Sequence, residues 1–150
     1  MINTSMKVSN LIFIDTWAWL ALANRKDTYH ESVKKYYFKI RKEKYWLITS
    51  DYVLDEVITA LFINVAFDRA AKFVESLFTM IKDGQLELEK ITDKRFKEAW
   101  PLRKKYADKP DISFTDLTTF VIMQKRRISR VLTGDSHFEK VNLGFEVLPK

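Results

Sequence analysis

Hydrophobic residues occur along this chain in two patterns, short unbroken runs and longer stretches with helical spacing. The run at residues 11–14 is rich in β-branched and aromatic types, which indicates a strand buried on both faces. Residues 45–49, 131–133 and 145–148 are predicted to be strands as well. Residues 86–89 instead alternate apolar and charged side chains, as in an edge strand with one wet face.

The stretches between these strands carry apolar residues at helical spacing. The predicted helices span about residues 16–23, 27–44, 51–65, 68–83, 92–106 and 113–127. Thr16 is expected to cap the first helix and Ser113 the last, because hydroxyl side chains favour helix N-termini. Pro101 is expected to kink or restart the fifth helix, because proline lacks the N–H that an interior helical bond needs.

Strands that alternate with helices predict parallel βαβ units with right-handed connections. We therefore expect a three-layer α/β/α sandwich with a mostly parallel sheet of about five strands. The 150 residues are expected to form one domain, 1–150, which is long enough for a sizeable core. The low content of glycine and proline and the 47% of apolar residues argue against disorder.

The formal net charge of +6 favours a polyanionic partner such as nucleic acid, although it also fits a merely soluble basic protein. The absence of cysteine excludes disulfides and thiolate metal sites. Residues 11–23 resemble a signal peptide, but Asp15 inside this apolar run argues against one. No run reaches the roughly 20 apolar residues of a membrane span. We expect a cytoplasmic protein that has no membrane segment.

Acidic residues fall where this architecture places the carboxyl ends of strands, the edge at which open parallel sheets bind ligands. Asp15 directly follows the first strand, and Asp135 comes two residues after the fourth. Glu56 borders the apolar face of the helix after the second strand, and Asp116 lies one turn after Ser113. These four acids are predicted to converge.

Four carboxylates at one edge of a sheet would repel one another unless a cation neutralised them. Mg²⁺ prefers oxygen ligands and commonly lies between a few carboxylates and a substrate phosphate. Such a centre can polarise a phosphoryl oxygen and activate a water molecule. An acidic metal site in a basic protein therefore suggests phosphodiester hydrolysis.

Each acid also has a structural interpretation when it is taken alone. Asp116 fits a capping box that begins at Ser113, and Asp135 fits a turn. Glu56 alone resembles an ordinary exposed helical carboxylate. Asp15 has few structural explanations, because it ends an apolar strand. Only the four acids together favour the metal site over these alternatives.

Several other polar residues are weaker candidates for this site. Asp111 lies close enough to the same edge to be a reserve ligand, whereas His30 and His137 are interpreted as structural or exposed residues. Basic residues cluster at 94–97, 103–105 and 125–130. If some of them border the site, they would bind phosphates without recognising sequence.

Four motifs around these acids resemble those of the PIN-domain family, and more closely its VapC-like toxins. They are Ile14-Asp15-Thr16, Asp55-Glu56-Val57, Asp111-Ile112-Ser113-Phe114-Thr115-Asp116 and Leu132-Thr133-Gly134-Asp135-Ser136-His137-Phe138. The third motif is the most specific, and the resemblance runs essentially from end to end. Two positions depart from the family pattern: Pro101 interrupts a helix, and Gly134 is expected to loosen the loop before Asp135.

The resemblance implies a Mg²⁺- or Mn²⁺-dependent endoribonuclease with one or two ions, a toxin that a cognate VapB-like antitoxin neutralises and that is usually a homodimer. The residues concerned are Asp15, Glu56, Asp116 and Asp135, supported by Thr16 and Thr133. Asp15 and Asp116 are expected to be direct metal ligands, and the other two acids to bind the metal or orient its water. The two threonines would hydrogen-bond those waters or the carboxylates.

Two alternative functions remain compatible with the sequence. A non-catalytic RNA-binding or interaction module could keep this fold without turnover, although the complete set of acids argues against it. A phosphatase could use Asp15 as a nucleophile, but Trp17 stands where aspartate-nucleophile phosphatases carry a second aspartate.

Overall fold

Five short strands form one parallel sheet in the computed structural model, which describes residues 10–149. They are β1 (Leu11–Ile14), β2 (Trp46–Ser50), β3 (Glu87–Glu89), β4 (Arg130–Leu132) and β5 (Glu146–Leu148). Their order across the sheet is β3-β2-β1-β4-β5, and every neighbouring pair is parallel. This confirms the predicted parallel sheet and the edge position of the alternating strand.

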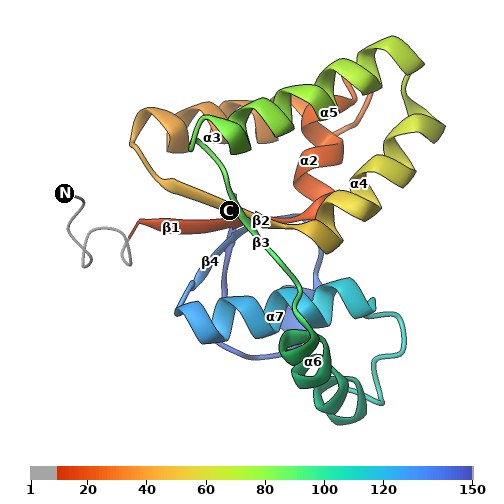
Figure 1. The fold of residues 1–150 in the computed structure, drawn as a ribbon, viewed down its shortest axis with the longest axis vertical. Helices are drawn as coiled ribbons and strands as arrows, with labels where there is room; N and C mark the ends of the chain where they lie inside the picture. The colour runs from red at the N-terminus through yellow and green to blue at the C-terminus, as the bar shows by residue number, and fades with distance from the viewer. Residues whose placement is uncertain (1–9, 150) are drawn as a thin grey trace.

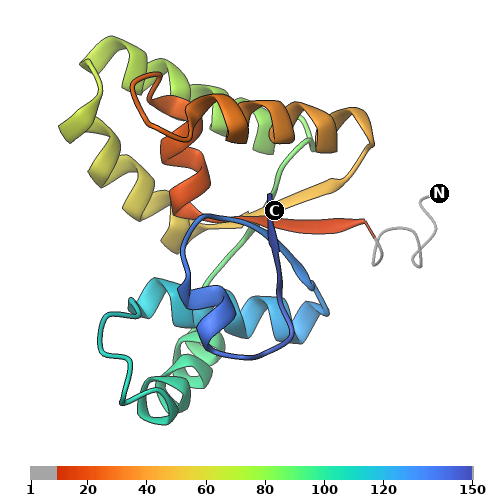
Figure 2. The same cartoon turned by 180° about the vertical axis from the view of Figure 1, so that it is seen from behind.

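Helices cover both faces of this sheet. Those in the described residues are α2 (Thr16–Ala23), α3 (His30–Lys42), α4 (Asp51–Asn64), α5 (Phe67–Lys82), α6 (Asp93–Lys105), α7 (Phe114–Arg126) and α8 (His137–Lys140). Helices α2 to α5 lie on one face, and α6, α7 and α8 lie on the other, so the predicted three layers are present (Figures 1 and 2). Within residues 10–149, no helix is both long and apolar enough to cross a membrane.

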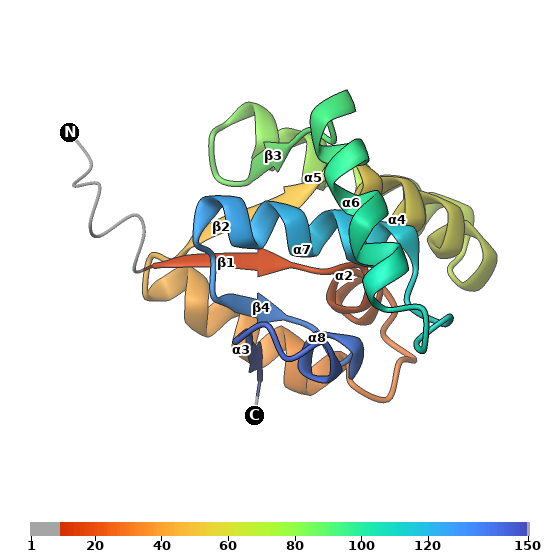
Figure 3. The same cartoon turned by 90° about the horizontal axis from the view of Figure 1, so that it is seen from below.

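The central strand β1 has an exposed fraction of at most 3% at each of its residues. Burial of a Leu, Ile or Phe side chain is worth about 1.5–3 kcal/mol, so β1 is firmly held in the core. Its register places Ile14 opposite Leu132 of β4 and Phe13 opposite Ile48 of β2. The carboxyl ends of the three strands consequently meet at one edge, where α2 begins (Figure 3).

Several predictions about helices were wrong in detail. Asp15, and not Thr16, occupies the N-cap position of α2, and its side chain makes no capping bond. The second helix begins at His30, three residues later than predicted, because Asp27 accepts a hydrogen bond from the Tyr29 backbone N–H in a preceding turn. Helix α6 continues through Pro101. The short helix α8 was not predicted.

Candidate active site

The buried carboxylate of Asp15 lies at the carboxyl edge of the sheet, with an exposed fraction of 2%. The Thr133 hydroxyl donates to Asp15 Oδ2 at 2.8 Å and accepts from the Asp135 backbone N–H at 3.0 Å. Thr133 therefore links the ends of β1 and β4 and fixes two of the predicted acids. Asp15 Oδ1 is buried and has no hydrogen-bond partner among the described residues. An unpartnered buried carboxylate oxygen is costly without a cation or a proton.

Asp116 lies in the first turn of α7, with an exposed fraction of 6%. The Ser113 hydroxyl accepts from the Asp116 backbone N–H at 3.0 Å, so the predicted cap of this helix is present. The Asp116 carboxylate contacts a different residue, because its Oδ2 lies 3.2 Å from His137 Nδ1. The cap and the acid are thus separate features of one turn, and the cap orients the acid.

Glu56 reaches the same region from α4. It accepts a hydrogen bond from the Thr16 hydroxyl, which lies 2.8 Å from Glu56 Oε1. Thr16 follows Asp15 directly, so this bond ties the start of α2 to α4. The neighbouring Asp55 is exposed, which separates the two acids of this motif in space.

Electrostatics at this edge disfavour several negative charges at once. Burial raises the pKa of Asp15 to about 7, and the nearby charge of Asp116 adds to the effect. Burial also raises the pKa of Asp116 to about 6, with a further contribution from the Asp135 charge. Carboxyl groups held together against their mutual repulsion are typical of sites that bind a cation.

His137 is the main residue of this site that the sequence interpretation missed. Its Nδ1 lies 3.0 Å from Asp135 Oδ1 and near Asp116, and its Nε2 lies 3.0 Å from Asp111 Oδ2. Burial alone would lower the pKa of His137, but hydrogen bonds to Asp111 and Asp116 raise it above its ordinary value. The sequence offered one signal for this role, because His137 follows Asp135 by two residues. At this spacing the His137 backbone N–H donates to the Asp135 side chain, which keeps the two residues together.

The donor set fits a hard divalent cation. Ligand atoms of Asp116, Asp135 and His137 lie within 4.8 Å of one another, and Asp15 offers an unpartnered oxygen nearby in the same acidic cluster. Oxygen-rich sets of this kind suit Mg²⁺ or Mn²⁺. Asp111 stays at the rim, with a side chain 72% exposed, and reaches the other acids through His137.

Gly134 does not loosen the loop before Asp135. A Cβ atom at this position would overlap the indole ring of Trp17 from α2. The absence of a side chain therefore lets the loop pack closely against that ring, which itself packs on Tyr29. The departure from the family pattern at Gly134 is a packing feature, and the expected loosening is not observed.

Many residues of the predicted basic clusters have structural partners. Arg95 pairs with Glu89, and Arg126 pairs with both Glu87 and Glu89 on the edge strand β3. Arg103 donates to the backbone carbonyls of three residues in the α6–α7 connection: Tyr106, Lys109 and Ile112. Their charges therefore hold elements together at these positions.

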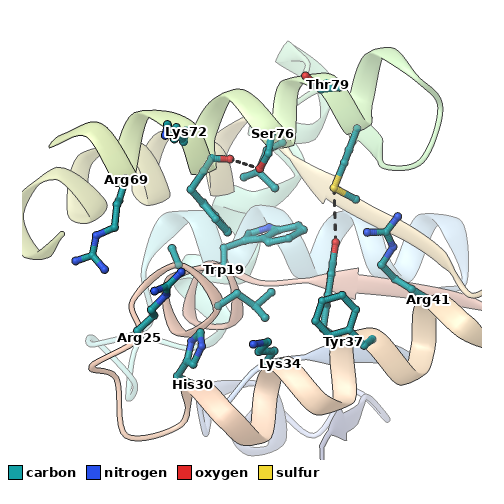
Figure 4. A pocket seen from close by; sticks show the side chains of 16 residues that line it. Trp19, Arg25, His30, Lys34, Tyr37, Arg41, Arg69, Lys72, Ser76 and Thr79 are labelled. Atoms are coloured by element: carbon teal, nitrogen blue, oxygen red, sulfur yellow. Dashed lines mark hydrogen bonds between the residues drawn. The ribbon is translucent and has the colours of Figure 1, made fainter. Parts of the chain in front are cut away.

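A separate groove of about 780 Å³ lies between α2, α3 and α5 (Figure 4). Its walls include apolar side chains such as Trp19, Leu77 and Met80. Its cationic lining residues are Arg25, Lys34, Arg41, Arg69 and Lys72, and no acid is among the lining residues in the described part of the chain. The groove is thus an apolar trough with a basic rim.

The fold and the site together define a parallel α/β/α protein with an acidic centre at the carboxyl edge of its sheet. The chain belongs to the PIN-domain family, whose model matches residues 12–143. It is 30% identical over 142 residues to the 23S rRNA-specific endonuclease VapC20 of Mycobacterium tuberculosis, a match that covers 93% of this chain and 100% of that relative.

Solved structures agree with this assignment. The crystal structure of Mycobacterium tuberculosis VapC20, described as a sarcin-ricin loop cleaving toxin, has a TM-score of 0.74 at 26% identity and covers 87% of this chain and 95% of that one. A chain of VapBC2 from Rickettsia felis, bound to a promoter DNA fragment, has a TM-score of 0.67 at 13% identity. The match covers 92% of this chain and 97% of that one. At that identity the second likeness shows the fold alone.

Proposed function

We propose that this chain is a divalent-metal-dependent endoribonuclease that hydrolyses RNA phosphodiester bonds as the toxin of a toxin–antitoxin pair. The observation that carries the proposal is the buried Asp15 carboxylate, which has one unpartnered oxygen and a raised pKa beside Asp116. The 30% identity to a 23S rRNA-specific endonuclease supports ribosomal RNA as the substrate class. We also propose that the chain acts in the cytoplasm.

In this proposal Asp15, Asp116 and Asp135 hold one or two Mg²⁺ or Mn²⁺ ions, with Glu56 as a further ligand or as an acceptor for water. A bound cation would polarise the phosphoryl oxygen and lower the pKa of an attacking water. Thr133 keeps Asp15 Oδ2 occupied, which leaves Oδ1 for a ligand. Thr16 orients the Glu56 carboxylate through its hydroxyl.

The non-catalytic alternative is less well supported, because a binding module would gain nothing from burying Asp15 and Asp116 beside each other at a cost in stability. The phosphatase alternative is also weaker, because the indole ring of Trp17 packs against Gly134 at the position where a second acid would be needed.

We propose that an antitoxin segment occupies the groove between α2, α3 and α5. Its apolar walls and its five cationic lining residues fit an amphipathic helix that carries acidic residues on its polar face. The fold shared with a chain of a VapBC complex is consistent with such a partner. We also propose a homodimer, which the exposed Ile63 and Phe67 at the α4–α5 turn support.

The nuclease proposal is tested by RNA cleavage with Mg²⁺, with Mn²⁺ and with EDTA. Asp116→Asn keeps a good helix-terminal residue but removes one charge from the cluster, so cleavage should fall by about 100-fold or more while the fold survives. Asp55→Asn, on the exposed side of the same motif as Glu56, is the matched control and should cleave at the wild-type rate. Wild-type cleavage by Asp116→Asn, or cleavage in EDTA, would refute the proposal.

A further inference from the structure

Helix α6 exposes two large aromatic side chains on one face. The exposed fraction is 47% for Phe96 and 56% for Trp100. They are four residues apart in the helix and therefore lie on the same side of it. Exposed aromatic residues that are grouped in this way mark interaction sites more often than isolated ones do.

The charge around these two rings is positive. Helix α6 carries six cationic and two acidic side chains, and Glu98 is already paired with Lys125. Lys97 and Lys104 share the face of the aromatic pair by helical spacing, and neither has a side-chain partner within residues 10–149. We call Phe96, Lys97, Trp100 and Lys104 the α6 platform. Asp93, at the start of the helix, is the acid on this face.

The α6 platform is fixed to the element that carries Asp116. The Phe96 and Phe114 rings lie 4.9 Å apart between centroids, and Phe114 is the first residue of α7. At the other end of the helix, Arg103 holds the α6–α7 connection through three backbone carbonyls. Figure 3 shows α6 crossing α7, with this connection at the end of the sheet where α2 begins.

We propose that the α6 platform binds unpaired RNA nucleotides next to the scissile phosphodiester, an inference that rests on the proposed nuclease function. Exposed aromatic rings stack on bases, and adjacent lysines bind the backbone phosphates. An RNA double helix keeps its base faces covered, so the exposed rings favour single-stranded segments and loops. The unpaired lysines favour a polyanion over an apolar protein surface.

The test measures binding of a labelled single-stranded RNA in EDTA, where cleavage is blocked and affinity is read directly. Trp100→Ala removes a stacking ring and should weaken RNA binding by about tenfold or more. Trp100→Phe keeps an aromatic ring and should therefore retain most of the wild-type affinity. Replacing both Lys97 and Lys104 by Ala should reduce the slope of log affinity against log salt by roughly 1.4. Phe78→Ala, an exposed aromatic on α5, is the control and should bind like the wild type.

The outcomes separate this inference from the nuclease proposal. If the wild type cleaves RNA but Trp100→Ala binds RNA with unchanged affinity, the α6 platform is wrong and the nuclease stands. If the wild type cleaves no RNA with either metal, the nuclease proposal is wrong. The binding measurements in EDTA then still test whether the α6 platform binds RNA. A Trp100→Ala variant that changes only the sedimentation of the protein would identify the face as a protein interface and overturn the proposal.

Discussion

The two most buried acids control how stability depends on pH. The pKa of Asp15 is about 7 and that of Asp116 about 6 in the folded state, both above the ordinary value of 3.8. Between pH 5 and pH 8 the folded state therefore binds more protons than the unfolded state, and stability falls as pH rises. His137 also makes stability fall as pH rises, because its pKa is raised in the folded state. Its stabilising positive charge is lost as the pH rises through this folded-state pKa.

We expect the melting temperature in EDTA to fall by roughly 5 °C or more between pH 5 and pH 8, since each unit of pKa difference corresponds to about 1.4 kcal/mol. Mg²⁺ should oppose this trend, because it binds the deprotonated carboxylates. Asp15→Asn should raise the melting temperature at pH 8 in EDTA, and Asp55→Asn should not. A melting temperature in EDTA that is flat over this range would contradict the electrostatic account.

Gly134 gives a second prediction at the scale of a residue. Gly134→Ala places a methyl group against the Trp17 ring, so we expect a loss of about 1–3 kcal/mol and lower RNA cleavage through displacement of Asp135. Combining it with Trp17→Leu should recover part of the stability, which chemical denaturation measures as a coupling energy. Independent, additive losses would show that the ring and the glycine do not interact.

At the scale of elements, the α6–α7 connection depends on Arg103. Arg103→Lys cannot supply the planar set of donors that contacts three carbonyls, so the connection should loosen and the N-terminus of α7 with it. We expect weaker Mg²⁺ binding and roughly tenfold slower cleavage, with a stability loss of about 1–3 kcal/mol. Lys94→Ala on the same helix is the control. If Arg103→Lys binds Mg²⁺ as the wild type does, Arg103 only contributes to folding.

The strands and most helices were predictable because their hydrophobic periodicity spans enough residues to be read from the sequence. Helix α8 has four residues, too few for a helical pattern to emerge. Pro101 was expected to interrupt α6, but the buried Ala99 and the contact between Phe96 and Phe114 pack that helix against α7. Tertiary packing thus outweighs the local cost of the proline.

The acids of the site could be proposed from the sequence for a different reason. Asp15, Asp116 and Asp135 follow a strand end or a helix start, and Glu56 borders the apolar face of its helix. The roles of His137 and Arg103 were not predicted. Among the contacts of His137, only that with Asp135 is local in sequence, and the others depend on the fold, as does the contact that Arg103 makes across the α6–α7 connection. His137 contacts Asp111, 26 positions earlier, and Arg103 contacts backbone carbonyls, which leave no trace in side-chain patterns. Whether a basic residue binds a substrate or the protein itself cannot be read from its cluster alone.

At the scale of the whole molecule, the groove is lined by α2, α3 and α5. Figure 1 shows these helices on one side of the sheet and α6, which carries the α6 platform, on the other side. Reversing the charge of cationic residues that line the groove should therefore weaken the binding of a partner in the groove. Arg69→Glu and Lys72→Glu together should weaken binding of the co-expressed antitoxin by tenfold or more, as measured by titration at low and high salt. Unchanged affinity would place the antitoxin elsewhere.

Asp15 is synthesised before Asp135, and 120 positions separate these first and last acids of the cluster. Strand β4 is synthesised after α7, yet it pairs with the central strand β1. Until β4 emerges, one edge of β1 stays open to other strands. No nascent fragment that ends before residue 135 carries all four carboxylates. If cleavage needs all four carboxylates, as the proposed site implies, a chain that terminates before residue 135 should not cleave RNA, and its strand β1 should keep one unpaired edge.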